Sequence, residues 1–211
     1  MSKTFFPQMT RSQYKTKDNG SWYAYRHYEV EITNDCLERC VYCDVHIKEI
    51  GLEGFHLDHF RPQDVFPDLI NTPDNLVIGC PKCNRWKSSH WPVSVELGLT
   101  HNDNVGFIDP FGHNRLDFFK VNSDGTLTPL KGPSQYLINL LNLNRASRVL
   151  VRRNRLLSCK LDQLIQLAEL TIQQTSNLID ENKPKELIKA KLKLAQAAIA
   201  DIKDIRGTLN A

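Results

Sequence analysis

Residues 55–62 read FHLDHFRP and residues 74–87 read DNLVIGCPKCNRWK, and these two stretches decide the fold. The first stretch alternates like a short strand and ends at Pro62, which cannot donate to a strand ladder. The apolar residues 76–78 predict a second strand, and Pro81 suits the first turn of a helix. We therefore expect a unit of strand, loop, strand and helix within an α+β fold.

The cysteines indicate a metal site beside this unit. The chain has six of them: Cys36, Cys40, Cys43, Cys80, Cys83 and Cys159. Four form two C-x-x-C pairs, a spacing that lets each turn present both sulfurs to one ion, so two turns complete a four-cysteine zinc site. Cys36 and Cys159 are expected to be buried small residues, although Cys36 lies close enough to the first pair to be a spare thiolate.

The composition and the first residues limit the class of protein. The 211 residues are 41% hydrophobic and 24% charged, which is typical of a globular chain. No apolar run approaches the roughly 20 residues of a membrane span, and the first ten residues lack the apolar core of a secretory signal. We therefore expect a cytoplasmic protein that makes no membrane contact, where reduced thiols favour metal binding over disulfides.

The two stretches carry a resemblance to a known family. They contain DHFRP at 58–62, DNL at 74–76 and CPKCN at 80–84 followed by Lys87. This order resembles the HNH nuclease superfamily, whose signature positions fall here on His59, Asn75 and Asn84. The resemblance covers about residues 36–92 and implies a ββα-metal finger braced by a zinc knuckle.

A second likeness extends further along the chain. FIDP at 107–110, the turn at Gly125 and LNLNR at 141–145 are similar to the HNH subunit of Septu-type and retron-associated anti-phage systems. In that family the subunit works with an ABC-like ATPase. The likeness implies a nuclease effector of prokaryotic defence that contacts such a partner through its C-terminal helices.

The residues of the finger suit phosphodiester hydrolysis. A histidine titrates near neutral pH, so His59 can take the proton of an attacking water. Asp58 and the side-chain carbonyl of Asn84 are hard oxygen ligands suited to Mg²⁺ or Mn²⁺, and such an ion stabilises the leaving oxygen. The family resemblance implies that Asn75 holds the loop between the strands. Asp58 and Asn84 could instead serve only in capping or turns.

Four further residues near the finger keep two interpretations open. On a strand His56 shares the face of Asp58, so it could approach metal or phosphate, or it could simply lie on the surface. Arg61, Arg85 and Lys87 could bind phosphates of DNA, although single charges of this kind are more often only solvated.

The formal net charge of +3 conceals opposing blocks. Residues 29–74 contain eleven acids and three bases, whereas residues 131–160 contain seven bases and no acid. The arginines of this basic segment are Arg145, Arg148, Arg152, Arg153 and Arg155. We interpret them, and Arg152, Arg153 and Arg155 above all, as DNA-backbone contacts, with docking of an acidic partner as the alternative.

The flanks complete a division into two domains. We expect a nuclease domain over residues 1–130, which includes an aromatic N-terminal strand at 22–28 and a hairpin turning at Asp124-Gly125. From Ser134 onward the pattern is helical, so residues 131–211 are expected to form a basic helix and then an antiparallel helical hairpin. This hairpin could cover the core, recruit a partner subunit or bind a second copy of the chain.

The sequence therefore predicts a zinc-braced, metal-dependent HNH endonuclease that acts on DNA. A stand-alone nuclease of the restriction or repair type is the first alternative. A zinc-knuckle module that binds nucleic acid without cutting it is the second, although binding alone requires no histidine beside a metal ligand.

Overall fold

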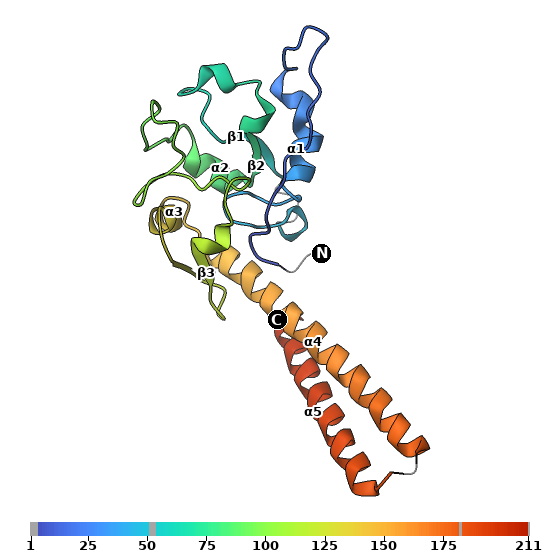
Figure 1. The fold of residues 1–211 in the computed structure, drawn as a ribbon. Helices are drawn as coiled ribbons and strands as arrows, with labels where there is room; N and C mark the ends of the chain where they lie inside the picture. The colour runs from blue at the N-terminus through green and yellow to red at the C-terminus, as the bar shows by residue number, and fades with distance from the viewer. Residues whose placement is uncertain (1–3, 51–53, 182, 211) are drawn as a thin grey trace. The chain divides into compact units, whose positions relative to one another are not determined.

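The computed structural model describes residues 4–50, 54–181 and 183–210, which divide into two compact units (Figure 1). The first unit is Thr4–Val151, and the second begins at Arg152. The first unit thus extends past the domain boundary expected after residue 130. Short 3-10 turns at Ile47–Glu49, Pro67–Leu69, Pro73–Asn75 and Arg115–Asp117 lie in its loops.

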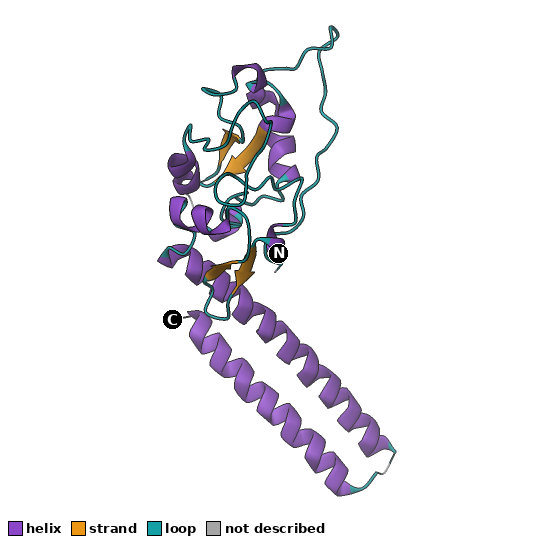
Figure 2. Cartoon of the chain, turned by 60° about the vertical axis from the view of Figure 1, so that its left-hand side comes forward, coloured by secondary structure: helices purple, strands orange, loops and turns teal. Residues whose placement is uncertain are grey.

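The expected strand, loop, strand and helix form the centre of the first unit. Strand β1 (His56–His59) pairs antiparallel with β2 (Leu76–Gly79), and helix α2 (Pro81–Lys87) follows directly. In the register of this pair, His59 lies opposite Leu76 and His56 opposite Gly79. All four residues of β2 are buried, and helix α1 (Glu29–Asp35) packs against this strand. The mixed α+β architecture is therefore confirmed (Figure 2).

Aromatic residues of the N-terminal segment pack this unit, but they do not form the expected strand. The described segment instead contains a 3-10 turn at Tyr25–Tyr28 and helix α1 (Glu29–Asp35). Within the described residues, the strand-type pairing of Trp22 is limited to an isolated bridge with Thr16. Tyr28 is 1% exposed and its hydroxyl donates to the carbonyl of Lys15, so the ring fills the core while the chain bends around it. A regular strand would not allow this bend.

A second small hairpin lies at the other end of the unit. Strand β3 (Phe119–Val121) pairs with β4 (Leu127–Pro129), and the turn between them passes through Gly125. The φ of Gly125 is 88°, a conformation that glycine adopts without strain. Helix α3 (Ser134–Leu140) then begins at the residue where the pattern becomes helical.

Two long helices, α4 (Ala146–Asp180) and α5 (Lys185–Asn210), form the expected hairpin (Figure 2). Nζ of Lys191 donates to Oε1 of Gln174 across the pair at 2.7 Å. The buried positions are mainly small residues: Ala168, Thr171, Thr175, Ala195, Ala198 and the larger Ile205. Asn182, in the expected turn, lies outside the described residues. No helix in the described ranges combines the length and the apolar character that crossing a membrane requires.

In the sequence of each helix, mainly apolar residues repeat at spacings of four and three, as in a coiled coil, and the structure buries only part of this repeat. Ala168, Thr175 and Ala195 of that pattern are buried, but Ile172 and Ile179 are 55% and 54% exposed. Small side chains allow the two backbones to approach closely. Several of the larger apolar residues, Ile172 and Ile179 among them, are consequently left on the outer surface of the hairpin.

Candidate active site and cysteine cluster

The two C-x-x-C turns bring four sulfurs together. Cys40, Cys43, Cys80 and Cys83 are all buried, and their sulfur atoms lie within 4.8 Å of one another. The first turn closes where the amide of Asp44 donates to the carbonyl of Cys40 at 2.9 Å. The second forms because Cys80 is the N-cap of α2, with Pro81 in the first turn behind it.

This cluster has the chemistry and the spacing of a structural zinc site. Sulfur ligands at about 2.3 Å in a tetrahedron stand about 3.8 Å apart. The sulfurs of Cys43 and Cys80 are 3.7 Å apart, and the cysteines of the described chain form no disulfide. Cys36 is also fully buried but lies outside the cluster, so it is not a fifth ligand there.

Two arginines at the beginning of α4 contact the sulfurs. Nη2 of Arg148 lies 3.4 Å from the sulfur of Cys80, and Nη2 of Arg145 lies 3.6 Å from that of Cys83. The Arg145 guanidinium also stacks over the ring of Trp86 at 5.0 Å. Four thiolates around one divalent ion carry two negative charges, and these arginines offset them. The expectation that Arg145 and Arg148 meet DNA is therefore corrected.

A polar cavity of about 380 Å³ lies at the open end of β1. Its walls come from the end of the strand, the loop after it, α2 and the N-terminal segment. The lining residues are Tyr25, Leu57, Asp58, His59, Pro62, Gln63, Asp64, Asn84, Lys87, Ser88 and Ser89. Neighbouring residues of a strand face opposite sides, but β1 ends at His59, so Asp58 and His59 both reach the cavity.

The imidazole of His59 has a defined orientation. Its Nε2 lies 2.8 Å from the carbonyl oxygen of Ile70, in the loop between the strands. A carbonyl oxygen can only accept, so Nε2 carries the proton of the neutral ring and Nδ1 keeps its lone pair. The Tyr25 ring packs beside it, with centroids 5.1 Å apart.

The carboxylate of Asp58 is held by two donors. The hydroxyl of Tyr42 donates to its Oδ2 at 2.6 Å, and Nζ of Lys87 lies 3.3 Å from its Oδ1. Burial raises the pKa of Asp58, while the nearby Lys87 acts to lower it. Burial also lowers the pKa of Lys87, and Asp58 opposes that shift. The two groups thus stabilise each other's charge in a poorly hydrated place.

The other side of the cavity carries Asn84 and His56. Nδ2 of Asn84 lies 3.5 Å from Nδ1 of His56, whose side chain is exposed. This contact uses the amide nitrogen, whereas coordination of a hard cation requires the carbonyl oxygen. Asp58 and Asn84 therefore line one polar cavity with side chains that carry oxygen donors, a chemistry that suits a divalent ion such as Mg²⁺.

Asn75 does not line this cavity but supports the loop behind it. Its Oδ1 accepts from the amide of Arg61 at 2.9 Å, and its Nδ2 donates to the carbonyl of the same residue at 3.0 Å. Its own carbonyl accepts from the amide of Phe60 at 2.8 Å. Asn75 is 5% exposed, so these bonds have little competition from water.

The basic residues near the cavity differ in how free they are to meet a phosphate. Nη2 of Arg61 donates to the carbonyl of Gly98 at 2.7 Å, and its guanidinium stacks near Trp91. Lys87 is 1% exposed, and its Nζ donates to Oδ1 of Asp58 and to the carbonyl of His59. Arg85 is exposed on α2, beside Asn84. Arg85 is therefore the most accessible of the three basic residues predicted there.

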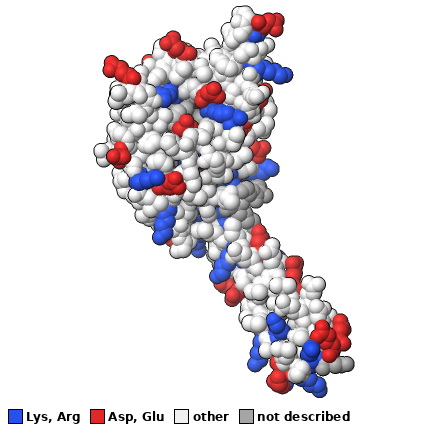
Figure 3. All heavy atoms as spheres, viewed as in Figure 1, with Lys and Arg blue, Asp and Glu red and all other residues white. Residues whose placement is uncertain are grey.

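The three arginines predicted to bind DNA from α4 also differ. Arg152 and Arg155 are 1% and 6% exposed, whereas Arg153 is exposed. On the face shown in Figure 3, Lys and Arg are interspersed with Asp and Glu rather than gathered in one block. Among these arginines, only Arg153 presents its charge to solvent.

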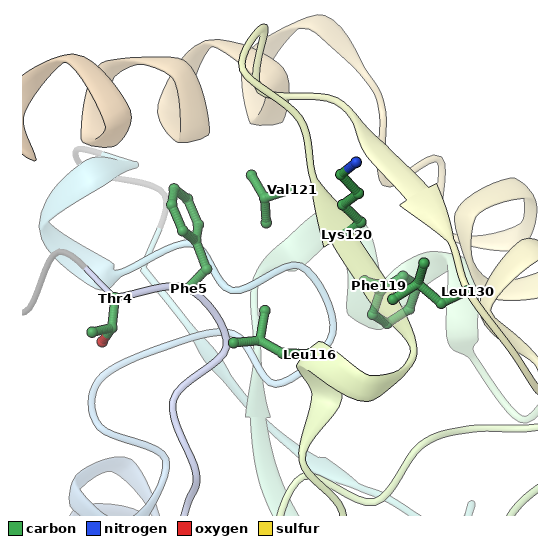
Figure 4. Close-up of a pocket in the computed structure, with 7 residues that line it drawn as sticks. All are labelled: Thr4, Phe5, Leu116, Phe119, Lys120, Val121 and Leu130. Carbon is green, nitrogen blue, oxygen red and sulfur yellow. The ribbon is translucent and has the colours of Figure 1, made fainter. Parts of the chain in front are cut away.

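A second pocket, about 450 Å³, is apolar and separate in its residues from the polar cavity (Figure 4). It is lined by Thr4, Phe5, Leu116, Phe119, Lys120, Val121 and Leu130. The described residues of this lining include no histidine, cysteine or carboxylate. We assign no catalytic chemistry to it.

Tyr42, Arg145 and Arg148 belong to the site, and none was predicted in these roles. A tyrosine inside a C-x-x-C turn carries no signal of its own, because its partner Asp58 is distant in sequence. Arg145 and Arg148 did carry a signal, because residues 131–160 contain seven bases and no acid. Such a segment indicates that its arginines pair with negative charge from outside the segment. The buried sulfurs supply it.

Comparison with known proteins agrees with this geometry. A sequence model of the HNH endonuclease family matches residues 40–90, the segment that contains all four clustered cysteines and the polar cavity's main residues. A protein of Vibrio cholerae serotype O1 biovar El Tor, assigned as the HNH endonuclease of retron Vc95, is 26% identical over 129 residues. That match covers 56% of this chain and 58% of the retron protein.

Two Septu proteins are also similar. PtuB of Bacillus thuringiensis is 33% identical over 61 residues, which cover 29% of this chain and 22% of PtuB. PtuA of Bacillus mycoides (strain KBAB4) is 25% identical over 134 residues, which cover 54% of this chain and 18% of PtuA. The chain thus corresponds to just over half of the retron protein and to about a fifth of each Septu protein. Residues 40–90 of the chain form a domain of the HNH endonuclease family.

Proposed function

We propose that the chain is a metal-dependent endonuclease that hydrolyses phosphodiester bonds of DNA. The observation that carries this proposal is the orientation of His59. Its Nε2–H donates a hydrogen bond to the carbonyl of Ile70, so Nδ1 is left to act as the base. His59 lines the same cavity as Asp58 and Asn84.

Each residue has a defined task in this proposal. His59 takes a proton from water at Nδ1, and the Ile70 carbonyl stabilises the imidazolium that results. Asp58 and Asn84 would hold Mg²⁺ or Mn²⁺, which when bound neutralises charge on the phosphate and stabilises the leaving oxygen. Asn75 keeps the loop that carries Ile70 in place. His56 and Arg85 are positioned to contact the phosphate backbone.

The four cysteines have a structural task. We propose that Cys40, Cys43, Cys80 and Cys83 bind Zn²⁺ and so fix the two turns that frame the finger. A structural zinc contributes folding free energy directly, which a finger with only two short strands requires.

The similarity to retron and Septu proteins supports a role in anti-phage defence with a partner subunit, for which an ABC-like ATPase is our candidate. The outer surface of the hairpin supports such a partner. Leu167 and Leu170 of α4 and Leu194 of α5 are 54%, 52% and 60% exposed. Exposed apolar side chains of this kind are typical of a surface that binds another protein. We place the protein in the cytoplasm, and a second copy of the chain is the alternative occupant of this surface.

A plasmid cleavage assay with Mg²⁺ or Mn²⁺ tests the nuclease proposal. Wild type, His59→Ala and the control His113→Ala, an exposed histidine outside the cavity, are compared with and without the product of the neighbouring gene. Loss of a general base costs about 10²- to 10⁴-fold. A folded, zinc-loaded His59→Ala protein that cuts DNA at the wild-type rate would refute the assignment. Binding of DNA without cleavage in every arm would favour the non-catalytic alternative.

A further inference from the structure

The side chain of Tyr42 joins the cysteine cluster to the polar cavity. Its backbone is inside the first C-x-x-C turn, between Cys40 and Cys43, and the residue is only 7% exposed. Its hydroxyl donates to Oδ2 of Asp58 at 2.6 Å, the short distance expected for a bond to a carboxylate. One residue thus belongs to both sites.

The ring of Tyr42 has little freedom to move. A Cβ atom at Gly79 would lie 3.3 Å from its Cε2, so the ring packs closely against the backbone of β2. On another side it meets Phe107 edge to face, with centroids 6.2 Å apart. Because the turn fixes the backbone and these contacts fix the ring, the first C-x-x-C turn contributes directly to the position of the hydroxyl.

The other oxygen of Asp58 is fixed from α2. Nζ of Lys87 lies 3.3 Å from Oδ1 and 2.7 Å from the carbonyl oxygen of His59, so it ties the carboxylate to the end of β1. A carboxylate offers about four lone-pair positions, and one donor on each oxygen leaves room for a cation. The Asp58 side chain is 10% exposed, so its opening toward the cavity is narrow and its direction matters.

We propose that Tyr42 is a positioning residue that couples the cysteine site to the binding of the divalent cation. It aims the Asp58 carboxylate into the cavity, so the first zinc turn sets the affinity for the second metal. This inference rests on the proposed function, in which Asp58 is a cation ligand. Loss of a group that orients a ligand typically lowers metal affinity by about tenfold or more.

Binding of Mn²⁺ to the full-length, zinc-loaded protein tests the coupling. Free Mn²⁺ is measured by electron paramagnetic resonance during titration, and bound zinc is measured in the same samples. Tyr42→Phe keeps the ring and removes only the hydroxyl. The matched control is Tyr14→Phe, which removes a tyrosine hydroxyl from a different carboxylate, Asp35. We expect about tenfold weaker Mn²⁺ binding for Tyr42→Phe and an unchanged affinity for Tyr14→Phe.

A double-mutant cycle with Asp58→Asn separates positioning from general damage. If Tyr42 acts through the carboxylate, Tyr42→Phe has little further effect once Asp58 is asparagine. An equal loss in both backgrounds, or wild-type Mn²⁺ affinity for Tyr42→Phe, overturns the inference. If Asp58→Asn itself binds Mn²⁺ like wild type, the proposed ligand role of Asp58 fails and the inference fails with it. A weakened Asp58→Asn beside an unaffected Tyr42→Phe rejects the coupling alone.

Discussion

Nε2 of His59 lies 2.8 Å from the carbonyl oxygen of Ile70, which makes the orientation of the proposed base depend on a loop rather than on its own strand. The loop joins β1 to β2 and contains two 3-10 turns. Its shape is held in part by Asn75, whose side chain bonds both backbone groups of Arg61. In the proposed mechanism, Asn75 would therefore act on the base indirectly, through the position of the Ile70 carbonyl.

Replacement of Asn75 by alanine should lower both stability and cleavage. The amide of Arg61 would lose its partner in a buried place, at a cost of about 1–3 kcal/mol in the free energy of unfolding. Asn75→Asp keeps the acceptor for that amide but replaces the donor with a carboxylate oxygen that faces the Arg61 carbonyl, so a comparison of the two by urea unfolding and plasmid cleavage shows whether the acceptor alone is sufficient. Wild-type stability of Asn75→Ala would contradict the role of this side chain in the loop.

Removal of a cluster cysteine should unfold the finger. Cys80→Ser takes away one of four sulfurs, and the turns then lose the ion that joins them. We expect loss of bound zinc and of near-ultraviolet circular dichroism. Cys159→Ser, outside the cluster, should keep both signals. Retention of one zinc per chain in Cys80→Ser would count against the four-sulfur site.

Replacement of Arg148 by alanine should speed zinc release. The guanidinium contacts the sulfur of Cys80 at 3.4 Å and offsets charge on the thiolates, so its loss leaves a more basic ligand that is easier to protonate. A chelator that changes colour on binding zinc measures the rate. Arg153→Ala, an exposed arginine on the same helix, is the matched control and should release zinc as wild type does. Equal rates for all three proteins would show that the contact is incidental.

Replacement of Arg85 by alanine should weaken DNA binding and reduce its dependence on salt. An arginine that contacts one phosphate contributes about one unit to the slope of log affinity against log salt. Anisotropy titrations of a catalytically inactive His59→Ala background at several salt concentrations measure this slope. Arg206→Ala, exposed on α5, should leave it unchanged. An unaltered slope for Arg85→Ala would show that Arg85 is a solvated charge that does not contact a phosphate.

The thiol of Cys36 should resist alkylation in the native protein. Burial raises the pKa of Cys36 to about 11, so at pH 8 almost none of it is the reactive thiolate. Peptide mapping after a short treatment with iodoacetamide, with and without denaturant, measures this protection. Rapid labelling of native Cys36 would mean that the packing around α1 opens readily.

Local signals were sufficient to predict the centre of the fold. Three such signals are the alternation before Pro62, the apolar residues of β2 and the proline after Cys80. Each depends only on residues close together in sequence, and the structure confirms the strand or helix that each predicted. The cysteine pairs were equally clear, because their spacing is set by the geometry of one ion. The order of these elements is what carried the resemblance to the family.

Features that depend on distant contacts could not be predicted in the same way. The N-terminal aromatics fit a strand by propensity, but the core around Tyr28 favours a bend. Arg145 and Arg148 were interpreted as DNA contacts because the count of charges treated the cysteines as neutral. The repeat of apolar residues in the helical hairpin is present, but its small members Ala168 and Ala195 are buried whereas Ile172 and Ile179 are exposed.

That count of charges has a consequence for the purified protein. The +3 total includes only lysine, arginine, aspartate and glutamate. With zinc bound as proposed, four thiolates and one divalent ion contribute two negative charges, which brings the total to about +1. At pH 7, where the four thiols of the zinc-free form are mostly protonated, the loaded protein should therefore carry about two fewer net positive charges. Cation-exchange chromatography at pH 7 can then separate the two forms and report how much of a preparation is properly assembled.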